Sequence, residues 1–381
     1  MSVQVRRTSA DINSEVHRLT DLRGIDVRVA VSGWQPAPGR RLLAAVTLVL
    51  AGAMASAQPA PTGSGSLPLL TSARAAHNMT AQEGARGYPV HLQAVVTSYD
   101  PYIDARHGAL FVLDKTGGIF VAVPARPVLP IHAGSLIDIR GVTGPGDYAP
   151  VVDHPQIRVI GEAPLPEKVP RASLAQMLTG EEDGQWIEAE GVVHSVRETE
   201  MDVTLDLALS DGKVSATTPK EPGVDYARLV DAKVKVHANV APFFNAYRQL
   251  AGVHLFFPSM SQVQIEAPAP PDPFVLPMRP IKSLLLYEPD VTFRHRVHVR
   301  GPVTLHWPGQ SLCIQDATQG LCAQAVQPTP AKVGDVVDVV GFLAGGGFTP
   351  TVTDATFRLA GAGRPILPVP VTPAEAFRGD H

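Results

Sequence analysis

Six side chains suited to ligand binding lie close together near the start of the first β-rich stretch. They are two aromatic rings, two carboxylates, a guanidinium and an imidazole: Tyr99, Asp100, Tyr102, Asp104, Arg106 and His107. Aromatic rings stack on flat ligands, while the polar groups bind their edges, so a sugar, peptide or cation fits here. The alternative is structural: Asp100 caps a turn, and Asp104 pairs with Arg106 in solvent. The loop lacks the dense carboxylates of a calcium loop, so we expect no metal.

A second aromatic cluster lies in the middle of the chain. It consists of Phe243, Phe244, Tyr247 and Arg248, around Asn245. These residues can stack on a flat ligand and hydrogen-bond its edge. The alternative is that the rings pack their loop against the protein.

The chain has two cysteines, Cys313 and Cys322. Two thiols cannot provide the four ligands of a zinc site. They fall on the two arms of a hairpin around 316–320. The sequence leaves open a cross-strand disulfide and a pair of buried thiols.

Basic residues alternate along 294–300. Arg294, Arg296, His298 and Arg300 share one face of a predicted strand, which indicates either an anionic partner or a solvated outer face. We expect the solvated face. His295 and His298 point to opposite sides, so they do not form a metal pair.

Catalytic motifs are missing from the sequence. It has no Gly-x-Ser-x-Gly elbow, no His-Glu-x-x-His and no dinucleotide fingerprint, and the glycine-rich segment 144–150 lacks the Gly-Lys-Ser/Thr of a phosphate loop. We therefore predict no catalytic residue, no metal, no cofactor and no enzymatic activity. The alternative is a secreted hydrolase that uses the 100–107 loop on a cell-wall or environmental polymer.

An internal repeat organises the chain. Gly134, Asp138, Gly141, Arg158 and Gly161 recur at 334, 338, 341, 358 and 361, each shifted by 200 positions. The segment 110–119 likewise resembles 312–321. A middle unit follows the same order less closely, and its alternation places Val203, Leu205, Leu207 and Leu209 on one strand face.

Each unit begins with a short helical lead-in and continues with about five strands. Glycines at bends and a proline-rich connector at 124–130 fit an all-β fold of tandem small Greek-key (OB-like) barrels, with a β-sandwich as the fallback. In such barrels, ligands lie across strands 2 and 3.

The predicted segments are 1–39 (disordered extension or start assigned too early), 40–57 (signal peptide), 58–69 (linker), 70–166, 167–272 and 273–368 (units), and 369–381 (start of a truncated fourth unit).

An export signal lies at 40–57. Arg40 and Arg41 precede an apolar run that starts at Leu42, and the run ends in Ala55-Ser56-Ala57. The run is short for a bilayer span, which needs roughly 20 residues. We expect cleavage after Ala57 and a periplasmic or extracytoplasmic location. An uncleaved anchor, or a region missing after His381, would instead associate the protein with a membrane.

Charge and composition limit the partners. The net charge of -4 argues against nucleic acid. The expected partner is a small molecule, a glycan or a periplasmic protein. The 33 glycines and 36 prolines of the chain fit a fold with many turns between short strands.

The lead-in and barrel series after an export signal resembles the extracytoplasmic sensory region of bacterial membrane-bound sensor histidine kinases. The stretches 87–97, 117–121 and 294–301 carry the resemblance, which covers roughly residues 70 to 381. It implies a sensory, ligand-binding role in a two-component-like protein. It supplies no catalytic residue, because the kinase core is absent from this chain. A scaffold whose barrels only dock partner proteins is a further possibility.

Overall fold

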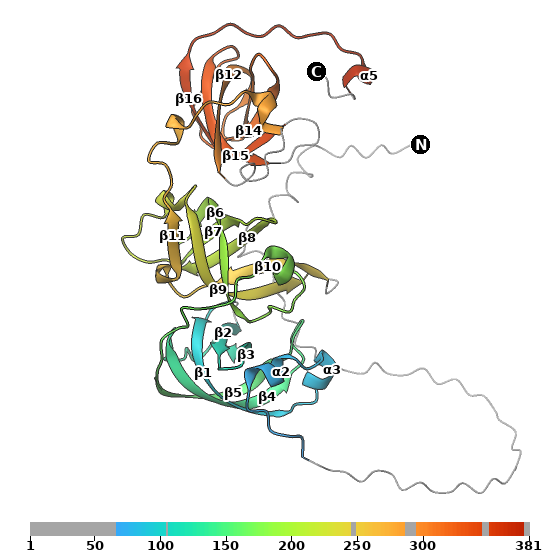
Figure 1. The fold of residues 1–381 in the computed structure, drawn as a ribbon, viewed down its shortest axis with the longest axis vertical. Helices are drawn as coiled ribbons and strands as arrows, with labels where there is room; N and C mark the ends of the chain where they lie inside the picture. Colours follow the sequence, from blue (N-terminus) through green and yellow to red (C-terminus); the bar gives the residue numbers. More distant parts are fainter. Residues whose placement is uncertain (1–65, 104–105, 245–248, 286–294, 345–349, 377–381) are drawn as a thin grey trace, which may run out of the picture. The chain divides into compact units, whose positions relative to one another are not determined.

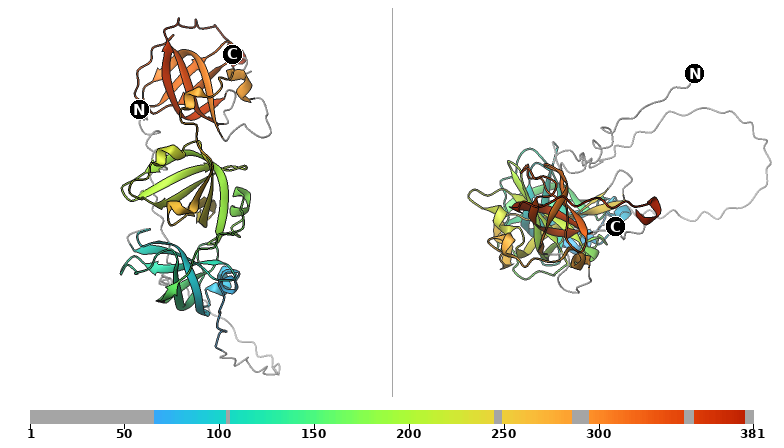
Figure 2. Two further views of the ribbon diagram at one scale, coloured as in Figure 1. Left: turned by 60° about the vertical axis from the view of Figure 1, so that its left-hand side comes forward. Right: turned by 90° about the horizontal axis from the view of Figure 1, so that it is seen from above.

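The computed structural model describes residues 66–103, 106–244, 249–285, 295–344 and 350–376 (Figure 1). Within these residues, three successive sheets of curved strands wrap round on themselves (Figures 1 and 2). The predicted all-β class of tandem OB-like barrels is confirmed. The predicted extension at 1–39 and signal peptide at 40–57 lie outside the described residues.

The first barrel has the Greek-key order β1-β2-β3-β5-β4 and is closed by pairing of β1 with β4. Its strands are β1 (Pro89–Asp100), β2 (His107–Leu113), β3 (Gly118–Pro124), β4 (Ser135–Gly144) and β5 (Val151–Glu162). Two short lead-in helices, α2 (Ala73–His77) and α3 (Ala81–Gly84), precede it. Alternate residues such as Leu110, Val112 and Ile119 fill the interior, because successive strand side chains point to opposite faces.

The second barrel keeps this topology but divides its last strand. It contains α4 (Leu174–Met177), β6 (Trp186–Glu198), β7 (Asp202–Ala208), β8 (Lys213–Pro219), the 3-10 turn η2 (Tyr226–Leu229), β9 (Lys233–Phe244), β10 (Leu250–Phe256), η3 (Met260–Gln262) and β11 (Val263–Ala267). β10 pairs in parallel with β8 and antiparallel with β9, as β5 does with β3 and β4. Val203, Leu205, Leu207 and Leu209 all lie in the core, which confirms the predicted alternation.

The third barrel repeats the first. It contains η4 (Pro273–Val275), η5 (Ile281–Leu285), β12 (Arg296–Trp307), β13 (Ser311–Gln315), β14 (Gly320–Gln324), β15 (Val336–Ala344) and β16 (Thr351–Gly361), followed by α5 (Pro373–Ala376). His154 in β5 and Asp354 in β16 both adopt φ 49°, at the same place in the two last strands. The sequence repeat thus extends to a local backbone kink. Cys313 and Cys322 are paired across β13 and β14 and joined by a disulfide.

Each lead-in is fastened to its own barrel by an aspartate in the turn between the second and third strands. Asp114 Oδ2 accepts the Ala73 N–H at 2.8 Å, and Asp316 Oδ2 accepts the Ile281 N–H at 2.7 Å. In the second barrel, Asp211 accepts the Ala175 N–H at 2.8 Å. These bonds satisfy backbone donors that a short helix leaves unpaired at its start.

Membrane spans are not found among the described helices: none is long and apolar enough to cross a bilayer.

Candidate ligand-binding faces

The predicted binding loop of the first barrel is largely used for its own structure. The Tyr99 hydroxyl accepts the Leu129 N–H at 3.1 Å, and its ring packs against the core. Asp100 Oδ1 accepts the Tyr102 N–H at 2.8 Å, which is the turn cap considered from the sequence. Tyr102 is exposed, His107 pairs with Pro124 at the start of β2, and the Arg106 carbonyl accepts the Ala125 N–H. Asp104 lies outside the described residues.

The second predicted cluster lies at the hairpin between β9 and β10. The Phe243 ring covers Gly252, where an added Cβ would lie 2.6 Å from the ring. This contact fits the alternative that the aromatic rings of this cluster pack their loop against the protein. Phe244 ends β9, while Tyr247 and Arg248 lie outside the described residues.

The basic strand of the third unit does not have the simple solvated face that the sequence predicts. Arg300 donates from Nε and Nη2 to the Asp338 carboxylate, and Arg358 donates to the same group at 3.1 Å. His298, 3% exposed, donates from Nδ1 to the Leu276 carbonyl at 2.8 Å. The segment around η4 covers this face, which the alternation of the strand alone did not indicate. Arg294 lies outside the described residues.

Outward side chains of the second barrel form a polar face over β6, β7, β8 and β10. Register places Asp206 between Ser195 on β6 and Ser215 on β8. Its carboxylate accepts both serine hydroxyls, at 2.6 Å and 2.7 Å, and the Arg197 guanidinium at 2.6 Å and 3.2 Å. The Asp206 side chain is 21% exposed and the Arg197 side chain 52% exposed, so solvent reaches both. The sequence does not single out this face, because the only sign of it is the polar residue that lies between each pair of inward apolar ones.

A second row of hydrogen bonds runs beside Asp206. The Thr204 and Thr217 hydroxyls lie 2.8 Å apart, and Thr217 Oγ1 lies 2.8 Å from His254 Nε2. Burial lowers the pKa of His254 to about 4, so the imidazole is neutral at pH 7. The Phe256 ring lies 4.8 Å from that of His254. The face thus combines hydroxyls, a carboxylate, a guanidinium and a neutral imidazole, and at one end the Phe256 ring packs against Phe111 of the first barrel.

The corresponding face of the first barrel is apolar. Phe111 on β2 is 3% exposed and contacts Phe120 on β3 edge to face, with ring centroids 5.2 Å apart. Phe256 from β10 stacks on Phe111 at 6.2 Å. This face packs against protein rather than offering a ligand site.

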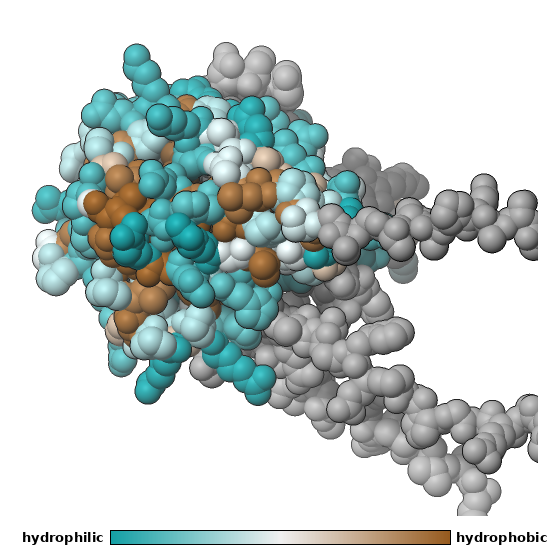
Figure 3. Space-filling view, turned by 90° about the horizontal axis from the view of Figure 1, so that it is seen from below, coloured by the Kyte–Doolittle hydropathy of each residue, from teal (hydrophilic) through white to brown (hydrophobic). Residues whose placement is uncertain are grey.

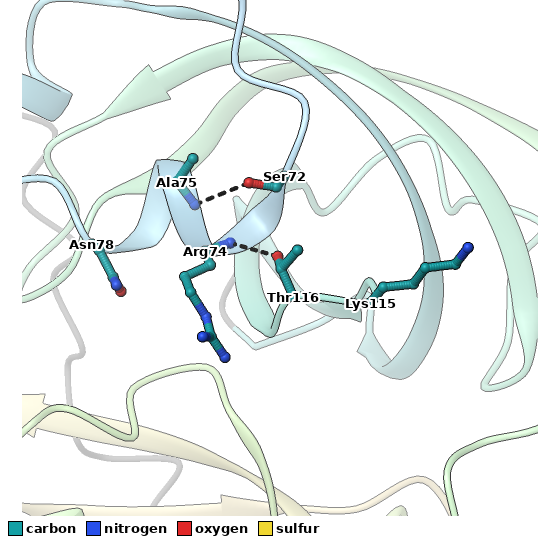
Figure 4. A pocket seen from close by; sticks show the side chains of 6 residues that line it. All are labelled: Ser72, Arg74, Ala75, Asn78, Lys115 and Thr116. Atoms are coloured by element: carbon teal, nitrogen blue, oxygen red, sulfur yellow. Dashed lines mark hydrogen bonds between the residues drawn. The ribbon is translucent and has the colours of Figure 1, made fainter.

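A separate pocket of about 490 Å³ lies between α2 and the β2–β3 turn. Its lining residues include Arg74, Asn78 and Lys115. Arg74 and Lys115 point in different directions (Figure 4), so their charges do not converge on one ligand. Among the described residues, no group of three or more His, Cys, Asp or Glu side chains is placed to hold a metal.

Apolar side chains also reach the surface in groups separated by polar ones on the face shown in Figure 3. Exposed apolar residues of the first barrel include Val159 (45%) and Ile160 (37%) on β5. Apolar surface of this kind can contact another protein.

No protein-family model and no curated protein matches the sequence. A murine DNA-binding protein bound with double-stranded DNA is 14% identical, with 48% of this chain and 97% of that chain covered and a TM-score of 0.26. A HIN domain in complex with 20 bp of double-stranded DNA is 9% identical, with 47% and 96% covered and a TM-score of 0.23. An aspartyl-tRNA synthetase from Leishmania major is 11% identical, with 28% and 22% covered and a TM-score of 0.22. These similarities concern the fold.

The exclusion of nucleic acid as a partner is wrong. The structures of similar fold include a murine DNA-binding protein and a HIN domain, each solved with double-stranded DNA. The exclusion relied on the net charge of -4, which is a sum over the whole chain. A summed charge does not describe the surface of a single barrel.

Proposed function

We propose that this chain is an extracytoplasmic sensory protein that binds a ligand and does not transform it, with the polar face of the second barrel as its recognition surface. The hydrogen-bonded set around Asp206 is the observation that carries the proposal. Export and the sensory role come from the signal segment and from the resemblance to sensor kinase regions.

Fixed polar groups support recognition at this face. Arg197, Ser195 and Ser215 hold the Asp206 carboxylate in one orientation. A ligand that meets groups already in place loses less free energy to ordering side chains. Because these residues stand on strands rather than in a loop, their spacing is set by the sheet.

The protonation state of His254 argues for binding over catalysis. General bases work best with a pKa near the working pH. The pKa of His254 is lowered to about 4 by burial, which makes the imidazole a weak base at pH 7. Asp206 is bonded to the serines and Arg197 instead of orienting the imidazole, as a catalytic triad requires.

A ligand screen with a matched variant tests the proposal. Thermal unfolding of the full chain is followed with a panel of monosaccharides, amino acids, dicarboxylates and mononucleotides. We expect at least one compound to raise the midpoint, and the shift to disappear in Asp206→Asn, because binding to the folded state stabilises it. Asp225→Asn is the control, since Asp225 pairs locally with Arg228 at the η2 segment. No stabilising compound, equal shifts in both variants, or conversion of the bound compound would each overturn the proposal.

Export is tested separately. The full gene is expressed in a bacterium, and the mature protein is recovered from the periplasm. N-terminal sequencing is expected to begin at Gln58. An intact N-terminus in the cytoplasmic fraction would contradict the extracytoplasmic assignment and leave the binding face to be judged by the ligand screen.

A further inference from the structure

An uncharged sheet face lies on the third barrel, on the outer side of β12, β13 and β14. Register places Leu305, Cys313 and Cys322 in one row, and Trp307, Ser311 and Gln324 in the next. Their neighbours Leu312, Ile314, Leu321 and Ala323 point inward and are buried. The six outward residues therefore form one continuous surface.

Two large apolar side chains on this face are exposed. Trp307 is 57% exposed and Leu305 is 40% exposed, whereas Trp186 in the second barrel is 2% exposed. A tryptophan leaves this much surface in water at a cost, because burying its ring is strongly favourable. An exposed indole on a rigid sheet is suited to stack against a ligand.

Charge on the face limits the ligand. None of the six outward side chains is ionisable, whereas the equivalent rows of the second barrel contain Arg197 and Asp206. A charged ligand would lose hydration here without gaining an opposite charge. Ser311 and Gln324 instead offer a hydroxyl and an amide, which donate and accept hydrogen bonds without charge.

The disulfide holds the platform together. Cys313 and Cys322 join the central strand β13 to β14 in the row beside Trp307, Ser311 and Gln324. A cross-link between neighbouring strands fixes the spacing of their side chains, and a pre-organised surface binds with less loss of entropy.

We propose that this face binds a neutral oligosaccharide, with a sugar ring stacked on Trp307 and sugar hydroxyls bonded to Ser311 and Gln324. A pyranose ring has an apolar C–H face and uncharged hydroxyls at its edge, which match the indole and the two polar side chains. A single-stranded nucleic acid also stacks on aromatic rings, but its phosphates require cationic side chains that this face lacks. The site is separate from the polar face of the second barrel.

Tryptophan fluorescence of the full chain tests this site directly. The probes are cellohexaose, xylohexaose and chitohexaose, with oligogalacturonate and oligo-dT as anionic comparisons. At least one neutral hexasaccharide is expected to shift or quench the emission in a saturable way. Trp307→Ala is expected to abolish the signal, and calorimetry should show affinity reduced about tenfold or more. Gln324→Ala is expected to weaken binding more moderately.

Two control variants show whether the sugar binds at this face. Leu359→Ala removes another exposed apolar side chain, 53% exposed, from β16 outside this face, and is expected to leave binding unchanged. Asp206→Asn is expected to leave it unchanged as well, so loss of the second-barrel site and loss of this one are distinguishable. Binding of oligo-dT, self-association that requires Trp307, or no response to any neutral hexasaccharide would overturn the proposal.

Discussion

The Arg197 guanidinium bonds both oxygens of the Asp206 carboxylate, with Nη1 2.6 Å from Oδ2 and Nη2 3.2 Å from Oδ1. Two parallel bonds of this kind fix orientation as well as charge. Ser195 and Ser215 complete the set from the strands on either side. These bonds occupy both carboxylate oxygens and hold the Asp206–Arg197 pair in one orientation on the sheet face, where 52% of the Arg197 side chain is exposed.

Asp183 is expected to make stability depend on pH in the mildly acidic range. Burial raises the pKa of its carboxyl to about 6, while His77 and the backbone N–H groups of Ala149 and Gly184 oppose that rise and Asp147 adds to it. The folded pKa lies above the unfolded value of 3.8, so the folded state holds the proton more tightly and loses stability as pH rises from about 4 to about 6. The shift corresponds to about 3 kcal/mol at most.

Asp183→Asn tests this dependence. The variant is expected to flatten the pH profile of the unfolding midpoint between pH 4 and 7 and to be more stable than the parent at pH 7. Asp225→Asn should keep the parent profile. If the unfolding midpoint of Asp183→Asn still falls with pH as steeply as that of the parent, another group is responsible for the dependence.

Asp338 is expected to have the opposite pH behaviour. Hydrogen bonds from Arg300, followed by Arg358, lower the pKa of this carboxyl to about 2, and the residue is 1% exposed. The folded pKa lies below the unfolded value of 3.8, so its contribution is present above that pH and is lost as pH falls toward 2. Asp338→Asn is expected to cost about 3 kcal/mol at pH 7, because it leaves cations without their partner. Urea unfolding of the parent and of Asp338→Asn at pH 7 and pH 2 checks this. If the difference in their free energies of unfolding is as large at pH 2 as at pH 7, the prediction is contradicted.

Asp316 is expected to hold the third lead-in in place. Its carboxylate accepts N–H groups of Ile281, Thr318 and Gln319. Asp316→Ala is expected to destabilise the barrel by about 1–3 kcal/mol and to speed exchange of the Ile281 amide hydrogen. Asp335→Ala removes a similar cap, on Lys332 N–H at 2.8 Å, and should leave Ile281 exchange unchanged. Unchanged exchange in Asp316→Ala would contradict the docking role.

Burial follows a period of two along a strand, so the sequence was sufficient to place Val203, Leu205 and Leu207 in a barrel core. The repeat at 134–161 and 334–361 likewise predicted matching barrels. Partners across strands depend on register, and register here shifts at an irregularity between Val193 and Ser195. No sequence pattern fixes that shift, so the contacts of Asp206 could not be foreseen.

The sequence also did not indicate which strand residues are covered by segments far away in the chain. His298 alternates with arginines along β12, yet the chain around Leu276 folds over it and the Leu276 carbonyl accepts a bond from its ring. Likewise, Asp114 and Asp316 lie in hairpin turns, but the lead-in residues that donate to them lie 41 and 35 positions away. Only the folded chain brings these groups together.

Calorimetric titration of the best ligand from the screen into the full chain and its Asp206→Asn variant tests the central claim most directly. We predict at least about tenfold weaker binding in the variant, parental affinity in Asp225→Asn, and recovery of the ligand chemically intact from the parent. Equal affinity in the parent and Asp206→Asn, or a ligand recovered as a product, would contradict recognition at this face.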